Sequence, residues 1–274
     1  RLHYVEEGDG PLVVLLHGFP EFWYSWRLQI PALAAAGFRV VAPDLRGYNL
    51  SSRPAGVAPY SVDLLARDVG DLIAERGETS AMVAGHDWGG VVAWALAATH
   101  PDAVQRLAIL NAPHPQSYVR GLRRPSQLLK SAYVFFFQLP RVPERALARE
   151  HFVALRSAFE QDARPGAFGA EDIERYVETW ARPGALTAML NYYRASTRRS
   201  PNSSVARKAI SAPTLIIWGG QDRYLEAGLA GPPEGSVPGL REVVHLPRAS
   251  HWVQHDEPEE VNRLLVDFFT EEAG

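Results

Sequence analysis

The sequence contains no cysteine. Disulfide bonds, thiol nucleophiles, iron–sulfur clusters and cysteine-ligated zinc sites are therefore excluded. Lysine is almost absent as well, because only Lys130 and Lys208 stand among the 28 basic residues. Long hydrophobic runs are also missing: the longest aliphatic run is Leu12–Leu16. A membrane span needs about 18 apolar residues, so none is predicted.

The chain of 274 residues has little excess charge, with 28 Lys+Arg against 31 Asp+Glu. This balance argues against a strongly cationic nucleic-acid binder, and a hydrophobic share of 46% argues against disorder. The arginines near 194–207 are interpreted as a solvated linker. The sequence opens without a signal peptide and predicts a cytoplasmic protein. The sequence begins at Arg1 and not at Met, so we expect that its N-terminus has been trimmed. The prediction of location therefore refers only to the residues given.

Short apolar β-runs alternate with helical patterns in the first part of the chain. Strands are predicted at 12–16, 39–42, 81–84 and 106–110, and helices at 25–36, 61–76 and 91–99. Short turns join them. This alternation predicts an α/β fold with a mostly parallel sheet and helices on both faces.

The alternation stops at about residue 114, and no β-run follows until residue 214. The stretch between contains four helical patterns, at 126–139, 143–159, 170–180 and 184–194. Strand character returns at 214–218 and 242–246, and a last helix is predicted at 258–269. The sequence therefore predicts an α/β core formed by residues 1–113 and 208–274, interrupted by a helical cap at 114–207.

One strand-to-helix turn has the sequence Gly-His-Asp-Trp-Gly-Gly, at 85–90. The Gly-x-nucleophile-x-Gly spacing is typical of the nucleophile elbow of α/β-hydrolases, but its central residue here is Asp87 and not Ser. A carboxylate that attacks an ester would give an anhydride, so an ordinary esterase is not predicted. A carboxylate is suited to displacing a leaving group from saturated carbon, which gives an alkyl-enzyme ester. The alternative is an aspartate in an ordinary turn.

Residues 17–21, His-Gly-Phe-Pro-Glu, follow the first core strand. In the hydrolase plan one oxyanion-binding N–H comes from this loop and another from the residue after the nucleophile. We therefore predict that the backbone N–H groups of Phe19 and Trp88 form the oxyanion hole. The alternative is a simple Gly-Pro turn, in which His17 is a structural residue.

Two more polar residues follow strands further along the chain, in the order acid then histidine. Asp222 follows the strand at 214–218, and His251 follows the strand at 242–246. The carboxyl ends of parallel strands meet at one edge of a sheet, so both are expected near Asp87. His251 is the predicted general base and Asp222 the acid that orients it. His255 is the alternative base, but it stands where the last helix is expected to begin.

These motifs together resemble the α/β-hydrolase-fold epoxide hydrolases of the soluble, bacterial type. The resemblance covers nearly the whole chain and also includes Asp-Leu-Arg-Gly-Tyr at 44–48, Asn-Ala-Pro-His-Pro at 111–115, Trp-Gly-Gly-Gln-Asp at 218–222 and Ser-His-Trp at 250–252. Several of these motifs also occur in haloalkane and haloacid dehalogenases. The chain departs from its relatives at 49–50, where Asn-Leu replaces the usual Gly and acidic residue.

The resemblance implies two cap tyrosines that bind and protonate the epoxide oxygen. Tyr133 resembles the first and Tyr193 the second, while Tyr118 and Tyr192 are the respective alternatives. A phenol suits this role because its ordinary pKa of about 10 keeps the proton in place at neutral pH. The residues expected to contact the substrate are Phe19, Pro20, Trp88, Phe137 and Trp252.

The predicted activity is conversion of epoxides to vicinal diols, with water as second substrate and no cofactor. A dehalogenase that uses the same nucleophile is the enzyme alternative, and a non-catalytic ligand receptor is the alternative from another class. No metal site is predicted, because His251 and His255 have separate explanations. Nucleic-acid and membrane partners are not expected, and a homodimer is compatible with the sequence.

Overall fold

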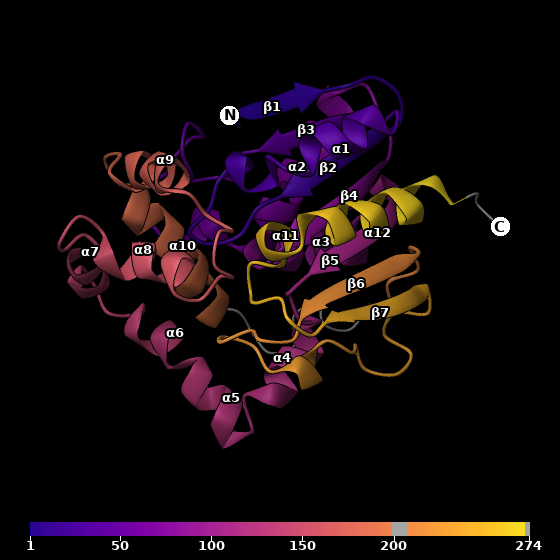
Figure 1. Cartoon of the computed structure of the whole chain (residues 1–274). Coiled ribbons are helices and arrows are strands. Elements are labelled where there is room, and N and C mark those ends of the chain that lie inside the picture. Colours follow the sequence, from indigo (N-terminus) through magenta and orange to yellow (C-terminus); the bar gives the residue numbers. More distant parts are fainter. Residues whose placement is uncertain (199–207, 272–274) are drawn as a thin grey trace.

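The computed structural model describes residues 1–198 and 208–271, and its centre is a seven-stranded sheet (Figure 1). The strand order is β1-β3-β2-β4-β5-β6-β7, and only the edge pair β1 and β3 is antiparallel. The strands are β1 Tyr4–Glu7, β2 Leu12–Leu16, β3 Arg39–Pro43, β4 Ala81–His86, β5 Val104–Leu110, β6 Thr214–Gly219 and β7 Leu240–Leu246. This architecture confirms the predicted α/β fold.

The central strands are almost completely buried because both faces of the sheet are covered. Every residue of β2 and β4 is buried. Side chains alternate between the faces, so Val14 packs in one hydrophobic cluster and Val13 in the other. The first cluster contains the core helices α2 Val62–Glu75 and α3 Trp88–Thr99 and extends into the helical insertion, and the helices of the second are α1 Ile30–Ala35, α11 Val253–Asp256 and α12 Pro258–Thr270.

A helical insertion separates β5 from β6 and packs at one end of the sheet (Figure 1). Its helices are α4 Pro115–Gly121, α5 Pro125–Lys130, α6 Ala132–Phe136, α7 Val142–Leu147, α8 Val153–Glu160, α9 Ala170–Trp180 and α10 Ala185–Thr197. The predicted cap is thus confirmed as an insertion. Its predicted end at residue 207 lies outside the described residues.

An aromatic cluster joins this cap to the core. Phe159 stacks on Tyr176 at 4.7 Å between ring centroids and packs on Trp252 of the core at 4.6 Å. The indole N–H of Trp180 donates to the carbonyl of Pro20 at 2.6 Å. Buried aromatic rings contribute both apolar area and directional contacts, so they fix the cap over the sheet.

The cap helices are more divided than the sequence pattern predicted. The predicted helix at 126–139 is two helices, α5 and α6, joined at Ser131, whose hydroxyl accepts hydrogen bonds from Tyr118 and Gln127. The predicted helix at 143–159 is broken between α7 and α8, where residues 150–152 all have positive φ. In the core, the predicted helix at 25–36 is a 3-10 turn at Trp23–Trp26 followed by α1.

The interpretation of residues 194–207 as a solvated linker is wrong for Arg194. This side chain lies in α10, is buried, and forms an ion pair with Glu144 at 2.8 Å. Residues 199–207 lie outside the described residues. Within the described ranges, no helix has the length and apolar character that crossing a membrane requires.

Candidate active site

Asp87 occupies the sharp turn between β4 and α3. Its φ of +49° lies in the left-handed region that non-glycine residues rarely adopt. The turn is this tight because its neighbours lack side chains. A Cβ on Gly89 would meet the carbonyl oxygen of Leu16 at 2.0 Å, and one on Gly18 would meet the Cβ of Asp87 at 2.5 Å. The strained turn therefore holds the carboxylate at a defined place beyond the end of β4.

The two oxygens of the Asp87 carboxylate have different surroundings. Oδ1 accepts a hydrogen bond from the backbone N–H of Phe19 at 2.8 Å. Oδ2 lies 3.6 Å from Nε2 of His251. Trp88 begins α3, and the first N–H groups of a helix have no partner within the helix. The structure thus places the N–H of Phe19 and the ring of His251 on opposite oxygens of one carboxylate, with Trp88 next in the sequence.

His251 and Asp222 form a buried pair behind this carboxylate. Nδ1 of His251 lies 2.7 Å from Oδ2 of Asp222. The other carboxylate oxygen of Asp222 accepts the backbone N–H groups of Tyr224 at 2.7 Å and Leu225 at 2.8 Å. These bonds hold the carboxylate in one orientation, and they fix the ring of His251 with Nε2 toward Asp87.

The charges in this group shift one another's pKa. Burial alone raises the pKa of Asp222, but the charge and hydrogen bond of His251 outweigh it and lower the pKa below the ordinary value. Burial lowers the pKa of His251, but the charge and hydrogen bond of Asp222, together with Asp87, raise it to about 10. The imidazole is therefore protonated at neutral pH and forms an ionic link between the two carboxylates.

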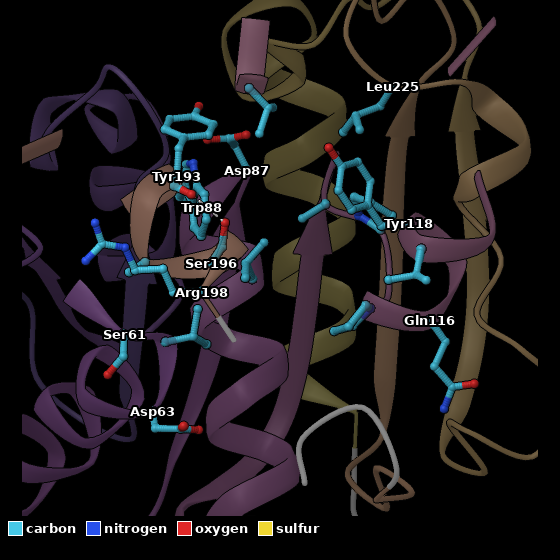
Figure 2. A pocket seen from close by; sticks show the side chains of 18 of the residues that line it. Ser61, Asp63, Asp87, Trp88, Gln116, Tyr118, Tyr193, Ser196, Arg198 and Leu225 are labelled. Atoms are coloured by element: carbon cyan, nitrogen blue, oxygen red, sulfur yellow. Dashed lines mark hydrogen bonds between the residues drawn. The ribbon is translucent and has the colours of Figure 1, made fainter. Parts of the chain in front are cut away.

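The predicted cap tyrosines lie above Asp87 on two different helices. Tyr133 comes from α6 and Tyr193 from α10, and their rings are 5.9 Å apart. The ring of Tyr193 also packs on Trp88 at 5.0 Å, beside the Asp87 carboxylate (Figure 2). Burial and the charge of Asp87 raise the pKa of both phenols well above 10, so both keep their protons.

The two alternative tyrosines have other partners. The hydroxyl of Tyr192 donates to the carbonyl of Arg46 at 2.7 Å, and its ring packs against Tyr48. Tyr118 faces the cavity across from Tyr193 (Figure 2), with its hydroxyl 3.2 Å from Oγ of Ser131. Tyr192 therefore lies outside the described cavity lining, whereas Tyr118, Tyr133 and Tyr193 all belong to it.

A cavity of about 910 Å³ extends from Asp87 between the cap and the core (Figure 2). Its inner wall includes Asp87, Trp88, Val91, Tyr118, Tyr133, Val134, Tyr193 and Leu225. Of the residues expected to contact the substrate, only Trp88 belongs to its described lining. Phe19 and Phe137 pack against the ring of Tyr193, at 5.3 and 5.0 Å. Pro20 and Trp252 belong to the buried contacts that join cap and core.

Sequence reasoning did not assign a role to Asn111, which follows β5. Its amide Nδ2 donates to Oδ2 of Asp222 at 2.7 Å, and its Oδ1 accepts the N–H of Gly219 at 2.8 Å. Asn111 therefore positions the same oxygen that His251 contacts. Its place directly after a parallel strand, like that of Asp222, was the signal that could have indicated this.

A fully buried cluster behind the elbow was also not foreseen. Glu21 contacts the rings of His86 and His255, at 2.9 and 3.0 Å. The other nitrogen of His86 lies 2.9 Å from the carbonyl of His251. Burial raises the pKa of Glu21, but the two histidines outweigh it and lower the pKa below its usual range. His255 thus faces Glu21 and not Asp87, whereas His17 accepts the N–H of Leu45 at 2.9 Å.

No group of three or more side chains of the metal-binding types is gathered anywhere in residues 1–198 and 208–271. The described site therefore consists of a carboxylate on a tight strand-to-helix turn, an Asp–His pair, backbone N–H donors and two phenols. Together with the sheet and its elbow, this set defines an α/β-hydrolase-type site with aspartate in place of serine.

Comparison with known proteins agrees with this class. The family model of the alpha/beta hydrolase fold matches residues 11–258. The AB hydrolase superfamily protein YfhM of Bacillus subtilis is 45% identical over 97% of this chain and 93% of its own length. Epoxide hydrolase 3 of Xenopus tropicalis is 41% identical over 99% of this chain and 75% of its own length.

Comparison with solved structures also finds epoxide hydrolases. A single-residue variant of an epoxide hydrolase from Bacillus megaterium, in complex with its diol product, superposes with a TM-score of 0.88 at 34% identity. The match covers 98% of this chain and 97% of that chain. The present chain belongs to the epoxide hydrolase family of the α/β-hydrolase fold.

Proposed function

We propose that this protein hydrolyses epoxides to vicinal diols through a covalent ester on Asp87. The observation that carries the proposal is the position of two phenols, the half-buried Tyr133 and the buried Tyr193, on the wall of the cavity that contains Asp87. Opening an epoxide needs a nucleophile for a ring carbon and a proton for the oxygen, because an alkoxide is a strongly basic leaving group. The diol bound to the related Bacillus megaterium enzyme supports the same reaction.

In the first step, Asp87 attacks a ring carbon of the epoxide. Its Oδ1 accepts the N–H of Phe19, so Oδ2 is the attacking oxygen. The Oδ2–C bond forms as the C–O bond of the ring breaks, and a phenol of the cap transfers its proton to the departing oxygen. Because burial raises the pKa of both phenols, neither loses its proton before the alkoxide develops. The product of this step is a hydroxyalkyl ester of Asp87.

In the second step, His251 activates water. Esterification removes the negative charge of Asp87, which is one of the groups that raise the pKa of His251. The pKa therefore falls, the ring passes its proton through solvent to the phenolate left by the first step, and Nε2 then accepts a proton from the attacking water. Asp222 stabilises the new imidazolium, and the N–H groups of Phe19 and Trp88 hold the oxyanion. The imidazolium then protonates the departing diol, and Asp87 is regenerated with one oxygen from water.

The test is a panel of epoxides assayed for diol formation. The wild type is compared with Asp87→Ala and with a matched control, Asp71→Ala, whose side chain is 72% exposed on α2. We expect Asp87→Ala to lose at least about a thousandfold in rate and Asp71→Ala to retain the wild-type rate. In a single turnover in heavy-oxygen water, the label should enter Asp87 and be absent from the first diol. A labelled first diol would contradict the covalent route.

The same preparations distinguish the dehalogenase and receptor alternatives. A halide leaves without a proton, so a dehalogenase does not need the phenols of Tyr133 and Tyr193. Halide release from haloalkanes at a rate that matches or exceeds diol formation would overturn the proposal. Tight binding of one ligand without turnover of any epoxide would instead favour the receptor.

A further inference from the structure

The outer margin of the cap is formed by α5, α6 and α7, which follow one another at the side farthest from α1 and α12 (Figure 1). Of the eleven large apolar side chains exposed in the described residues, six lie within the fifteen residues from 128 to 142. They are Leu128, Leu129, Phe135, Phe136, Leu139 and Val142, with exposed fractions from 37% to 77%. Such a concentration marks an interaction surface, because scattered single residues would need no explanation.

The same segment is strongly basic. Residues 120–149 contain seven basic side chains and one carboxylate, whereas the remaining residues contain 21 basic and 30 acidic side chains. The one carboxylate, Glu144, is bound to Arg194. Arg141, Arg145 and Arg149 are exposed and form no ion pair within residues 1–198 and 208–271. We call the exposed side chains of residues 120–149 the outer cap face.

The chemistry of this face indicates what covers it. Leucine and phenylalanine beside unpaired arginines are typical of surfaces that lie in the interface of an anionic membrane. A second copy of the chain fits less well, because a two-fold contact would bring the arginines of both copies together, and like charges at an interface are repelled. We propose that the outer cap face binds the surface of an anionic phospholipid bilayer, with its apolar side chains in the headgroup region and its arginines on the phosphates.

This binding mode needs no membrane-spanning helix, since the helices lie on the surface. Membrane binding would also affect access to the cavity, because α6 contributes side chains both to the cavity wall and to the outer cap face. Tyr133 and Val134 line the cavity, whereas Phe135 and Phe136 are exposed on the outside. At the edge of the face, Arg120 and Arg123 also line the cavity. An apolar ligand dissolved in the bilayer then reaches the cavity without crossing bulk water.

The test is cosedimentation of the full chain with vesicles of phosphatidylglycerol and phosphatidylcholine, compared with phosphatidylcholine alone. We expect binding to the anionic vesicles only, weakened as salt rises from about 0.05 to about 0.5 M. Removing three charges in Arg141→Gln/Arg145→Gln/Arg149→Gln should weaken the partition coefficient by about a hundredfold. The variant Leu129→Gln/Phe135→Gln should weaken it by at least about tenfold.

Matched controls remove the same groups elsewhere. Arg67→Gln/Arg175→Gln/Arg248→Gln changes three exposed arginines by the same total charge, and Leu50→Gln/Leu64→Gln changes two exposed leucines. Both should bind like the wild type. Absence of vesicle binding, or equal losses in the cap and control variants, would overturn the proposal. So would a dimer in sedimentation velocity that Leu129→Gln/Phe135→Gln dissociates, because the face would then be a contact between copies.

Discussion

The sheet and the cap contribute to the site in different ways. The sheet holds Asp87, Asp222 and His251 after the carboxyl ends of parallel strands, and hydrogen bonds of 2.7 to 2.8 Å hold all three. The cap contributes two phenols, one on the short helix α6 and one on α10, whose rings pack against each other and against Phe137. The sheet therefore supplies charged groups in fixed geometry, and the cap supplies neutral phenols, which are the proposed proton donors.

This difference indicates why the proposed nucleophile and base lie on the sheet and the proposed proton donors lie on the cap. A nucleophile and its base must be aligned before the substrate arrives, and rigid strand ends provide that alignment. Proton donors must contact whichever substrate enters, and an inserted layer can vary in shape without disturbing the sheet. The experiments that follow separate the two contributions.

The largest expected effect is the loss of the core base in His251→Gln. Glutamine cannot take a proton from water, so the ester on Asp87 should form and persist, and turnover should fall by at least about a thousandfold. Mass spectrometry of the intact protein after mixing with an epoxide should show the mass of one added substrate. The control His245→Gln changes an exposed histidine on β7 and should retain activity. Normal turnover by His251→Gln would remove His251 from its proposed role.

Removal of either cap phenol alone should have a smaller effect on the rate than the loss of His251. Tyr133→Phe and Tyr193→Phe should each slow ester formation by about tenfold to a hundredfold, because the second phenol still protonates the oxygen. The double variant should lose more than about a thousandfold. Rapid-mixing measurement of ester formation checks this, since the later hydrolysis step should be unaffected.

The control for the cap is Tyr192→Phe. It removes a hydroxyl that donates to the carbonyl of Arg46 and leaves the cavity lining unchanged. The free energy of unfolding should fall by about 1 kcal/mol and the rate of ester formation should stay within about twofold. A rate loss in Tyr192→Phe as large as that in Tyr193→Phe would reverse the assignment of the donors.

The parts of the fold that could be predicted from the sequence are those that depend on local pattern. The strand at 12–16 is observed with its predicted bounds, because a continuous apolar run in a parallel sheet has one solution. The cap helix at 170–180 also has its predicted bounds. The breaks at Ser131 and at residues 150–152 were missed, because they depend on distant hydrogen bonds and on left-handed backbone at residues without a glycine signal.

The site shows the same limit. The order of acid and histidine after successive strands indicated Asp222 and His251, and the structure brings them to Asp87. Asn111 and the buried Glu21 were not foreseen, because their partners are set by sheet register and not by local sequence. Whole-chain charge was likewise uninformative, since an overall balance of 28 basic and 31 acidic residues hides a basic cap segment.

The stability of the core should depend on pH through His251, whereas the cap phenols should not contribute below pH 10. The pKa of His251 is about 10 in the folded protein and about 6.5 in the unfolded chain. The protonated histidine therefore stabilises the folded state to its full extent below pH 6.5. This contribution is lost as pH rises toward 10. Urea unfolding at pH 6, 8 and 10 should therefore show the wild type losing a few kcal/mol relative to His251→Gln over this range. A constant difference would mean that folding does not raise the pKa of His251.

The smallest expected effect concerns the contact that ties the two regions together. The carboxylate of Asp256 accepts the backbone N–H of Arg164 from the cap at 2.8 Å and that of Ser250, next to His251 in the sequence, at 2.6 Å. In Asp256→Asn one acceptor becomes a donor, so one of these buried N–H groups loses its partner. We expect the free energy of unfolding to fall by about 1 to 2 kcal/mol and turnover to fall by less than about tenfold. The matched control Asp267→Asn alters a 62% exposed carboxylate on α12 and should change neither value measurably.

Because Asp256 touches no reacting atom, a loss in turnover that exceeds the loss in Tyr193→Phe would show that the sheet and the cap are not separable in the way proposed.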